Sequence, residues 1–70
     1  MNQRAWYAAE ATISRKASEA AEYGLMEAGS LGTEMSDTDT NVIVRGYFEE
    51  CPDIATVRAA LEDALRIYNL

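Results

Sequence analysis

Cys51 is the only cysteine in the sequence and its most nucleophilic side chain. It lies directly before Pro52 and Asp53, where we expect a helix to begin, and the positive end of a helix dipole can activate a thiol. The sequence contains no histidine, the commonest general base at neutral pH, and no second cysteine for a Cys-x-x-Cys pair. We therefore predict that Cys51 is structural or partly exposed, and we assign no catalytic residue.

Two short groups of acidic residues could bind a cation. Asp37 and Asp39 lie two residues apart in a polar stretch, and Glu49 and Glu50 are adjacent at the end of a predicted strand. Neither group has the further ligands and the bidentate glutamate of a calcium loop. The glycines lack the G-x-G-x-x-G spacing of a loop that binds phosphate. The sequence therefore predicts no metal site and no cofactor site in this chain.

The segment RGYF, residues 45–48, matches the opening of the signature of RNA-recognition motifs, K/R-G-F/Y-G/A-F. In those modules the aromatic side chains share the exposed face of a strand and stack on bases. Strand residues alternate between faces, so Tyr47 shares a face with Arg45 while Phe48 points the other way. The two glutamates that follow would also repel phosphate. We therefore predict that this strand does not bind RNA.

The charge of the chain points to the same conclusion. Twelve acidic and six basic residues give a formal net charge of −6, whereas nucleic-acid affinity depends on clustered Lys and Arg. An acidic surface instead favours a basic protein partner. No apolar run approaches the length of a membrane span, and the N-terminus lacks the pattern of a signal peptide. With a single cysteine as well, we expect a cytoplasmic domain without a membrane partner.

Residues 6–14 alternate between two faces, which predicts a half-buried strand. Residues 1–5 are expected to form a leader before it. One face of the strand consists of Tyr7, Ala9, Ala11 and Ile13. The other face consists of Trp6, Ala8, Glu10 and Thr12.

Two helices are predicted. Ser18 is the expected N-cap of the first helix, and Gly29 is expected just past its end in a left-handed conformation. The apolar positions of this helix are mostly small, so it can lie close on a sheet. The second helix is predicted to begin at Pro52 and Asp53, with Asp53 as the alternative N-cap. Its apolar stripe consists of Ile54, Val57, Leu61, Ala64, Leu65 and Tyr68.

Residues 31–35 and 42–50 are predicted to form a hairpin. Both segments read as strands, and residues 36–41 between them are rich in side chains that bond their own backbone in turns. On the second of these strands, Val42, Val44 and Phe48 are expected in the core. Gly46, on the same face, is expected to make room for a helix.

The resulting order of elements is strand, helix, strand, strand, helix in one small domain, residues 1–70. We expect an α+β fold of the ferredoxin-like plan β-α-β-β-α(-β), a two-layer sandwich with an antiparallel sheet. A right-handed crossover gives the sheet order 1-3-2. The fourth strand of this plan is absent or supplied by a partner. The first strand is then an open edge, and open edges pair with other chains.

Several segments together resemble the N-terminal domain of one protein family. The run AAEYGLMEAGSLGTE, residues 20–34, is similar to the first helix and second strand of the methyltransferase that modifies large-subunit ribosomal protein eleven. In that family a strand with a tryptophan precedes the helix, as Trp6 does here. A strand with terminal aromatic residues then leads into a helix start with an aspartate, as VRGYF at 44–48 leads to Pro52 and Asp53. The resemblance covers residues 6–68.

The resemblance implies that substrate recognition and catalysis belong to two different domains. The family's N-terminal domain is ferredoxin-like and recognises the ribosomal protein. A following Rossmann-type domain binds S-adenosylmethionine and transfers methyl groups to amines. These 70 residues do not contain the fourth strand, the acidic linker with tryptophan or the cofactor domain. The expectation is therefore a substrate-recognition domain, or a stand-alone relative, that does not catalyse the transfer by itself. The family places no catalytic residue in this segment.

Five residues are the predicted contacts with a protein partner. They share the sheet face opposite the helices, and aromatic and arginine side chains are frequent anchors of protein interfaces. The acidic charge suits a basic ribosomal protein. The predicted contacts are Trp6, Glu10, Glu34, Arg45 and Tyr47. The alternative function is a regulatory or oligomerisation module of the same fold, which would form a homodimer through the edge of the first strand.

Overall fold

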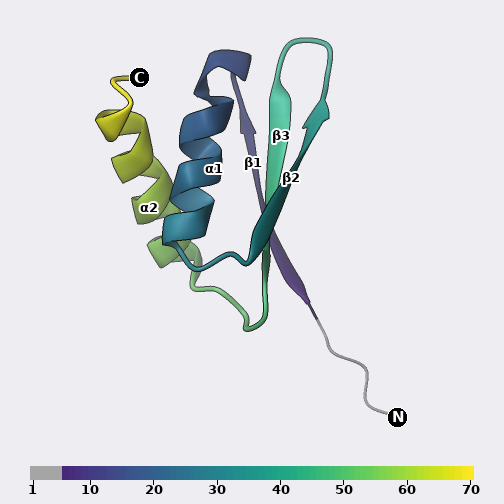
Figure 1. Ribbon diagram of the computed structural model, residues 1–70, viewed down its shortest axis with the longest axis vertical. Helices are drawn as coiled ribbons and strands as arrows, with labels where there is room; N and C mark the ends of the chain where they lie inside the picture. Colours follow the sequence, from purple (N-terminus) through teal and green to yellow (C-terminus); the bar gives the residue numbers. More distant parts are fainter. Residues whose placement is uncertain (1–5) are drawn as a thin grey trace.

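The computed structural model describes residues 6–70 as a small α+β domain with a three-stranded antiparallel sheet and two α-helices (Figure 1). The leader predicted for residues 1–5 lies outside the described residues. The predicted order of strands and helices is confirmed, with one additional 3₁₀ turn, η1, before the first α-helix. The elements are β1 (Tyr7–Ile13), η1 (Arg15–Ala17), α1 (Ser18–Glu27), β2 (Gly32–Asp37), β3 (Val42–Phe48) and α2 (Ile54–Ile67).

The strand β3 lies at the centre of the sheet. The sheet order is β1-β3-β2, as predicted, and both outer strands run antiparallel to β3. Val44 of β3 lies opposite Ala11 of β1 and Met35 of β2. The predicted third strand is too long at its end, because the chain bends at Glu49 and Glu50 toward α2 instead of continuing the ladder.

One face of β3 forms the middle of the core. Val42, Val44 and Phe48 are buried, which confirms the predicted alternation. Gly46 lies on the same face, under α1. A Cβ atom added there would lie 3.1 Å from the Cβ of Ser30 and 3.2 Å from the Cβ of Leu25. The glycine therefore sets how closely α1 approaches the sheet, as expected from the sequence.

The predicted start of α1 is wrong by one residue. Ser18 is the first residue of the helix, and Ala17 occupies the N-cap position without a side-chain hydrogen bond. The reason is η1, in which the amide of Ala17 donates to the carbonyl of Ser14 at 2.9 Å and leads directly into the helix. The predicted end is confirmed, because Gly29 adopts a left-handed conformation with φ of 109°. The amide of Ser30 then donates to the carbonyl of Leu25 at 3.0 Å and closes the helix.

The helix α2 begins with Asp53 as its N-cap, which is the alternative that the sequence predicts. The carboxylate of Asp53 accepts hydrogen bonds from the amide of Ala55 at 3.3 Å and from the hydroxyl of Thr56 at 3.0 Å. These bonds satisfy the first turn of the helix and fix where it starts.

The predicted apolar stripe of α2 is correct only in part. Val57 and Ala64 are buried, and Leu61 and Leu65 are half-buried, but Ile54 is 65% exposed. The sequence placed Ile54 in the core by its helical spacing. The prediction fails because α2 packs chiefly against α1 and makes few contacts with the strands, so its first turn has no strand beneath it.

A glycine makes the contact between the helices close. A Cβ atom added at Gly24 would lie 3.0 Å from the Cα of Leu61 and 3.1 Å from the carbonyl oxygen of Ala60. The backbones of α1 and α2 therefore nearly touch at this point. Neither α-helix within residues 6–70 has the length and apolar character needed to cross a bilayer.

Candidate functional site

A row of three charged residues crosses the outer face of the sheet, which α1 does not cover. Glu10 of β1 and Glu34 of β2 both lie directly opposite Arg45 of β3. The Nε of Arg45 donates a hydrogen bond to Oε2 of Glu10 at 2.6 Å, and a terminal guanidinium nitrogen contacts the same oxygen. The other terminal nitrogen lies 3.3 Å from Oε1 of Glu34. One guanidinium thus links all three strands through their side chains.

Tyr47 extends this row along β3. Its hydroxyl donates a hydrogen bond to Oε1 of Glu34, the same oxygen that Arg45 contacts. The side chain of Tyr47, together with the carboxylate of Glu10, raises the pKa of Arg45 above its usual range. Arg45 is therefore a fixed positive charge between two carboxylates at every pH at which proteins are ordinarily studied.

The structure brings four of the five predicted contact residues into mutual contact and leaves the fifth beside them in the sequence, at the start of β1. Glu10, Glu34, Arg45 and Tyr47 contact one another as described, and Trp6 lies immediately before β1 with half of its surface exposed. We call these five residues the outer-face cluster. Its charged members are all partly exposed to solvent.

The geometry of the row leaves one acceptor unused. Both contacts from Arg45 to Glu10 end on Oε2. Oε1 of Glu10 has no partner among the interactions described for residues 6–70. Since Glu10 lies on β1, at the end of the row, this carboxylate can still accept a hydrogen bond from outside the domain.

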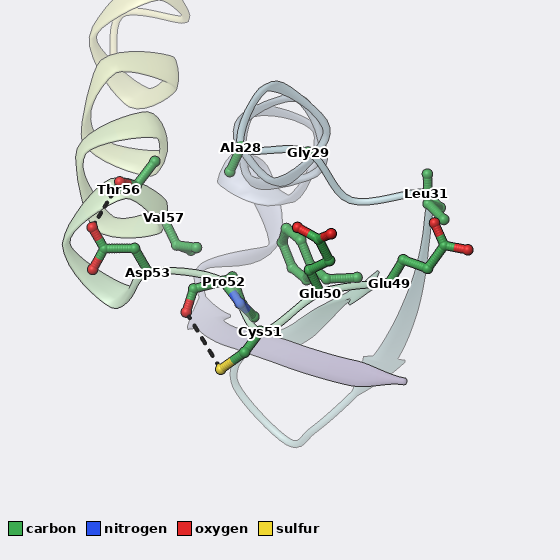
Figure 2. Close-up of a pocket in the computed structure, with 11 residues that line it drawn as sticks. Ala28, Gly29, Leu31, Glu49, Glu50, Cys51, Pro52, Asp53, Thr56 and Val57 are labelled. Atoms are coloured by element: carbon green, nitrogen blue, oxygen red, sulfur yellow. Dashed lines mark hydrogen bonds between the residues drawn. The ribbon is translucent and has the colours of Figure 1, made fainter. Parts of the chain in front are cut away.

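A separate cavity of about 360 Å³ lies at one end of the molecule (Figure 2). It lies between the end of α1, the loop after β3 and the first turn of α2. In Figure 2 the carboxylate of Glu50 points toward the end of α1 at Gly29, whereas the sulfur of Cys51 points away from Ala28. Cys51 is exposed, and its Sγ lies 3.9 Å from the carbonyl oxygen of Pro52.

The lining of this cavity contains no pair of nucleophile and base. Among its eleven residues the only titratable side chains are three carboxylates and the thiol of Cys51. Sequence reasoning missed the cavity because its walls come from three segments that are separate in the sequence. A signal was nevertheless present, since Gly29 and Pro52 mark two chain reversals that had to lie at the same end of the sheet.

Two further observations concern metal binding by the domain and its similarity to known proteins. Within residues 6–70, no group of three or more His, Cys, Asp or Glu side chains is placed to bind a metal ion. Comparison of the chain with protein-family models, with curated proteins and with solved structures found no match.

Proposed function

We propose that this domain recognises a protein substrate, as the N-terminal domain of a ribosomal protein methyltransferase does. We assign it the ferredoxin-like plan, of which residues 6–70 supply β1, α1, β2, β3 and α2. The sheet order β1-β3-β2 and the position of α1 on one face support this assignment. The resemblance of residues 6–68 to that family supports the function.

The observation that carries the proposal is the outer-face cluster. It places Arg45 and Tyr47 on the face of the sheet that α1 leaves open, with the half-exposed Trp6 immediately before β1, and arginine and aromatic residues are the usual anchors of protein interfaces. The cluster has two carboxylates and one guanidinium, and the chain carries a formal net charge of −6. The excess of carboxylates in the cluster and the negative net charge of the chain both favour a basic partner, such as a protein of the large ribosomal subunit.

The proposed role does not include catalysis. The domain binds the ribosomal protein, and transfer of methyl groups from S-adenosylmethionine belongs to a separate domain of the parent family. On this proposal the chain works in the cytoplasm, where ribosomes are assembled, and it needs neither a nucleic acid nor a membrane as its partner.

The test is a calorimetric titration of the domain with purified ribosomal protein eleven. We expect saturable binding that weakens when Tyr47→Ala or Trp6→Ala removes an aromatic anchor. Tyr23→Ala is the matched control, because Tyr23 is an exposed aromatic residue of α1, away from the cluster. Absence of binding at high micromolar concentration would contradict the proposal.

A second candidate function is self-association through the edge of β1. It is favoured by one observation: within residues 6–70, β1 pairs with β3 and with no other strand. Two copies could join at this edge. The charge of −6 on each copy opposes such pairing, so we place this function second. Analytical ultracentrifugation over a range of concentrations tests it, and a monomer at every concentration would remove its support.

A further inference from the structure

The cavity at the end of α1 has an apolar floor and an open mouth. Phe48 of β3 and Val57 of α2 line it and are buried, so they lie at its bottom. Leu31 lines it as well and is exposed, so it lies at the mouth. The volume of about 360 Å³ falls within the range of ligand pockets in proteins, about 300–1,000 Å³. No residue of β1 is in the lining, so the cavity is formed without any part of the open edge of the sheet.

The charged groups of the cavity are all negative. Its lining contains three carboxylates, from Glu49, Glu50 and Asp53, and no lysine or arginine. The carboxylate of Asp53 already caps α2 through Ala55 and Thr56. Glu50, by contrast, is exposed, and its side chain has no hydrogen bond or ion pair with another of residues 6–70. Its carboxylate is therefore available to a ligand.

The end of α1 brings a second negative group to the same cavity. The last carbonyl groups of a helix have no partner within it and carry a partial charge equivalent to about −0.5 elementary charge. A basic side chain in the last turn offsets this charge, as Arg66 does in α2, but the last turn of α1 contains no basic residue and ends with Glu27. Figure 2 shows the carboxylate of Glu50 pointing toward this helix end at Gly29. Two negative groups thus face each other, and the lining supplies no positive group between them.

We propose that this cavity binds an arginine side chain of a partner protein. The guanidinium lies between the carboxylate of Glu50 and the end of α1, where it offsets both negative groups. The aliphatic stem lies against Phe48, Val57 and Leu31, because long basic side chains bury their methylene groups along apolar surface. The inference goes beyond the proposed function, since none of the residues that line the cavity belongs to the outer-face cluster.

The arrangement of the acceptors favours a guanidinium over other cations. Its planar fork has five N–H donors, so it can donate to a carboxylate on one side and to carbonyl groups on the other. A lysine ammonium is a compact, strongly hydrated point charge. A metal ion fits poorly, because the floor is apolar and residues 6–70 bring no three metal-binding side chains together. The formal net charge of −6 attracts a basic protein at longer range.

A pair of matched peptides tests the proposal by NMR titration of the isotope-labelled domain. The first is capped Gly-Arg-Gly. In the second, citrulline replaces arginine, which keeps the length and shape of the side chain but removes its charge. We expect the arginine peptide to shift the amides of Gly29 and Glu50 and the methyl groups of Leu31 and Val57, with affinity about fivefold above that of the citrulline peptide. Shifts confined to other surfaces, equal affinity, or no shift at millimolar concentration would overturn the proposal.

Two variants and their matched controls locate the contacts. Glu50→Gln should abolish the preference for the arginine peptide, whereas Glu62→Gln, which removes the same charge from an exposed position of α2 outside the cavity, should preserve it. Leu31→Ser should weaken both peptides about threefold by removing apolar contact area. Ile67→Ser should change neither affinity, because Ile67 is 64% exposed, like Leu31 at 61%, but lies outside the cavity. Equal effects of the two members of either pair would overturn the proposed position of the side chain.

The remaining outcomes separate this inference from the proposed function. If ribosomal protein eleven binds but the arginine peptide leaves the cavity unchanged, the function stands and the arginine site is refuted. If the peptide binds as described but the ribosomal protein does not, the arginine site stands and the function is refuted. If butylguanidinium, which has the stem and head without a peptide backbone, binds more tightly than the peptide, the occupant is a small cation and our assignment of a protein side chain is overturned.

Discussion

The guanidinium of Arg45 donates from Nε to Oε2 of Glu10 at 2.6 Å, and the two residues face each other directly across β3 and β1. Arg45 is also within 3.3 Å of Glu34 on the other side. A single side chain at the centre of the sheet thus sets the charge pattern of the whole outer face.

Replacing Arg45 should destabilise the domain in a manner that depends on salt. In Arg45→Gln, Glu10 and Glu34 lose their shared cation and remain on the same face. We expect a lower Tm at low ionic strength and a smaller difference at high ionic strength, because salt screens partly exposed charges. Thermal unfolding followed by circular dichroism at several salt concentrations measures this. Arg66→Gln, which removes a pair within α2 to Asp63, is the control and should change Tm less. A Tm difference independent of salt would contradict the electrostatic origin.

The contribution of Arg45 to stability should not vary with pH in the neutral range. Its pKa is raised in the folded domain, so its contribution is fully present below the pKa of the unfolded chain and is lost only as pH rises through the folded value. Both values lie far above neutrality. The Tm difference between the wild-type domain and Arg45→Gln should therefore be the same at about pH 6 and about pH 9. A difference that shrinks steadily between these pH values would be the contrary result.

Gly46→Ala should lower the free energy of unfolding by about 1–3 kcal/mol, because the new methyl group overpacks the core. Both atoms that it would meet, the Cβ atoms of Leu25 and Ser30, are attached directly to the backbone and cannot move aside cheaply. Urea unfolding measures the change. Gly32→Ala in β2 is the control, because nothing lies within 4 Å of its added methyl group, and it should be neutral or slightly stabilising.

Gly24→Ala should also destabilise, although alanine is the better helix former. The gain in helix propensity is about 1 kcal/mol, and the clash with the backbone of α2 costs about 1–3 kcal/mol, so the net loss is about 1 kcal/mol. The clash should also shift α2. Tyr23 and Tyr68 have ring centroids 6.0 Å apart across the two helices, so their near-ultraviolet circular dichroism should change with the shift. A more stable variant with an unchanged aromatic signal would contradict the close contact.

The sequence predicts which face of a strand is buried better than it predicts which elements a helix packs against. The alternation of residues 42–48 identifies the buried face of β3, because side-chain parity is a local property. Gly29 and Asp53 identify a helix end and a helix start for the same reason. Ile54 was misplaced because helical spacing shows which residues share a flank but not whether a strand lies beneath it.

The charged row could be predicted only in part. Alternation placed Glu10, Glu34 and Arg45 on one face, but their contact depends on the register between strands that are distant in the sequence. The unused oxygen of Glu10 depends in turn on the conformation of one arginine side chain. These features require the three-dimensional arrangement, as does the cavity near Cys51, whose walls come from three segments.

The close contact at Gly24 has a thermodynamic consequence for whatever binds the outer face of the sheet. Because the backbone of α2 rests on α1, the helix keeps its place although it makes few contacts with the strands. The position of α2 is therefore fixed by the helix pair, and binding at the sheet does not have to order the helix first. The entropy lost on binding then falls mostly on the partner, so affinity should increase when the partner is already ordered.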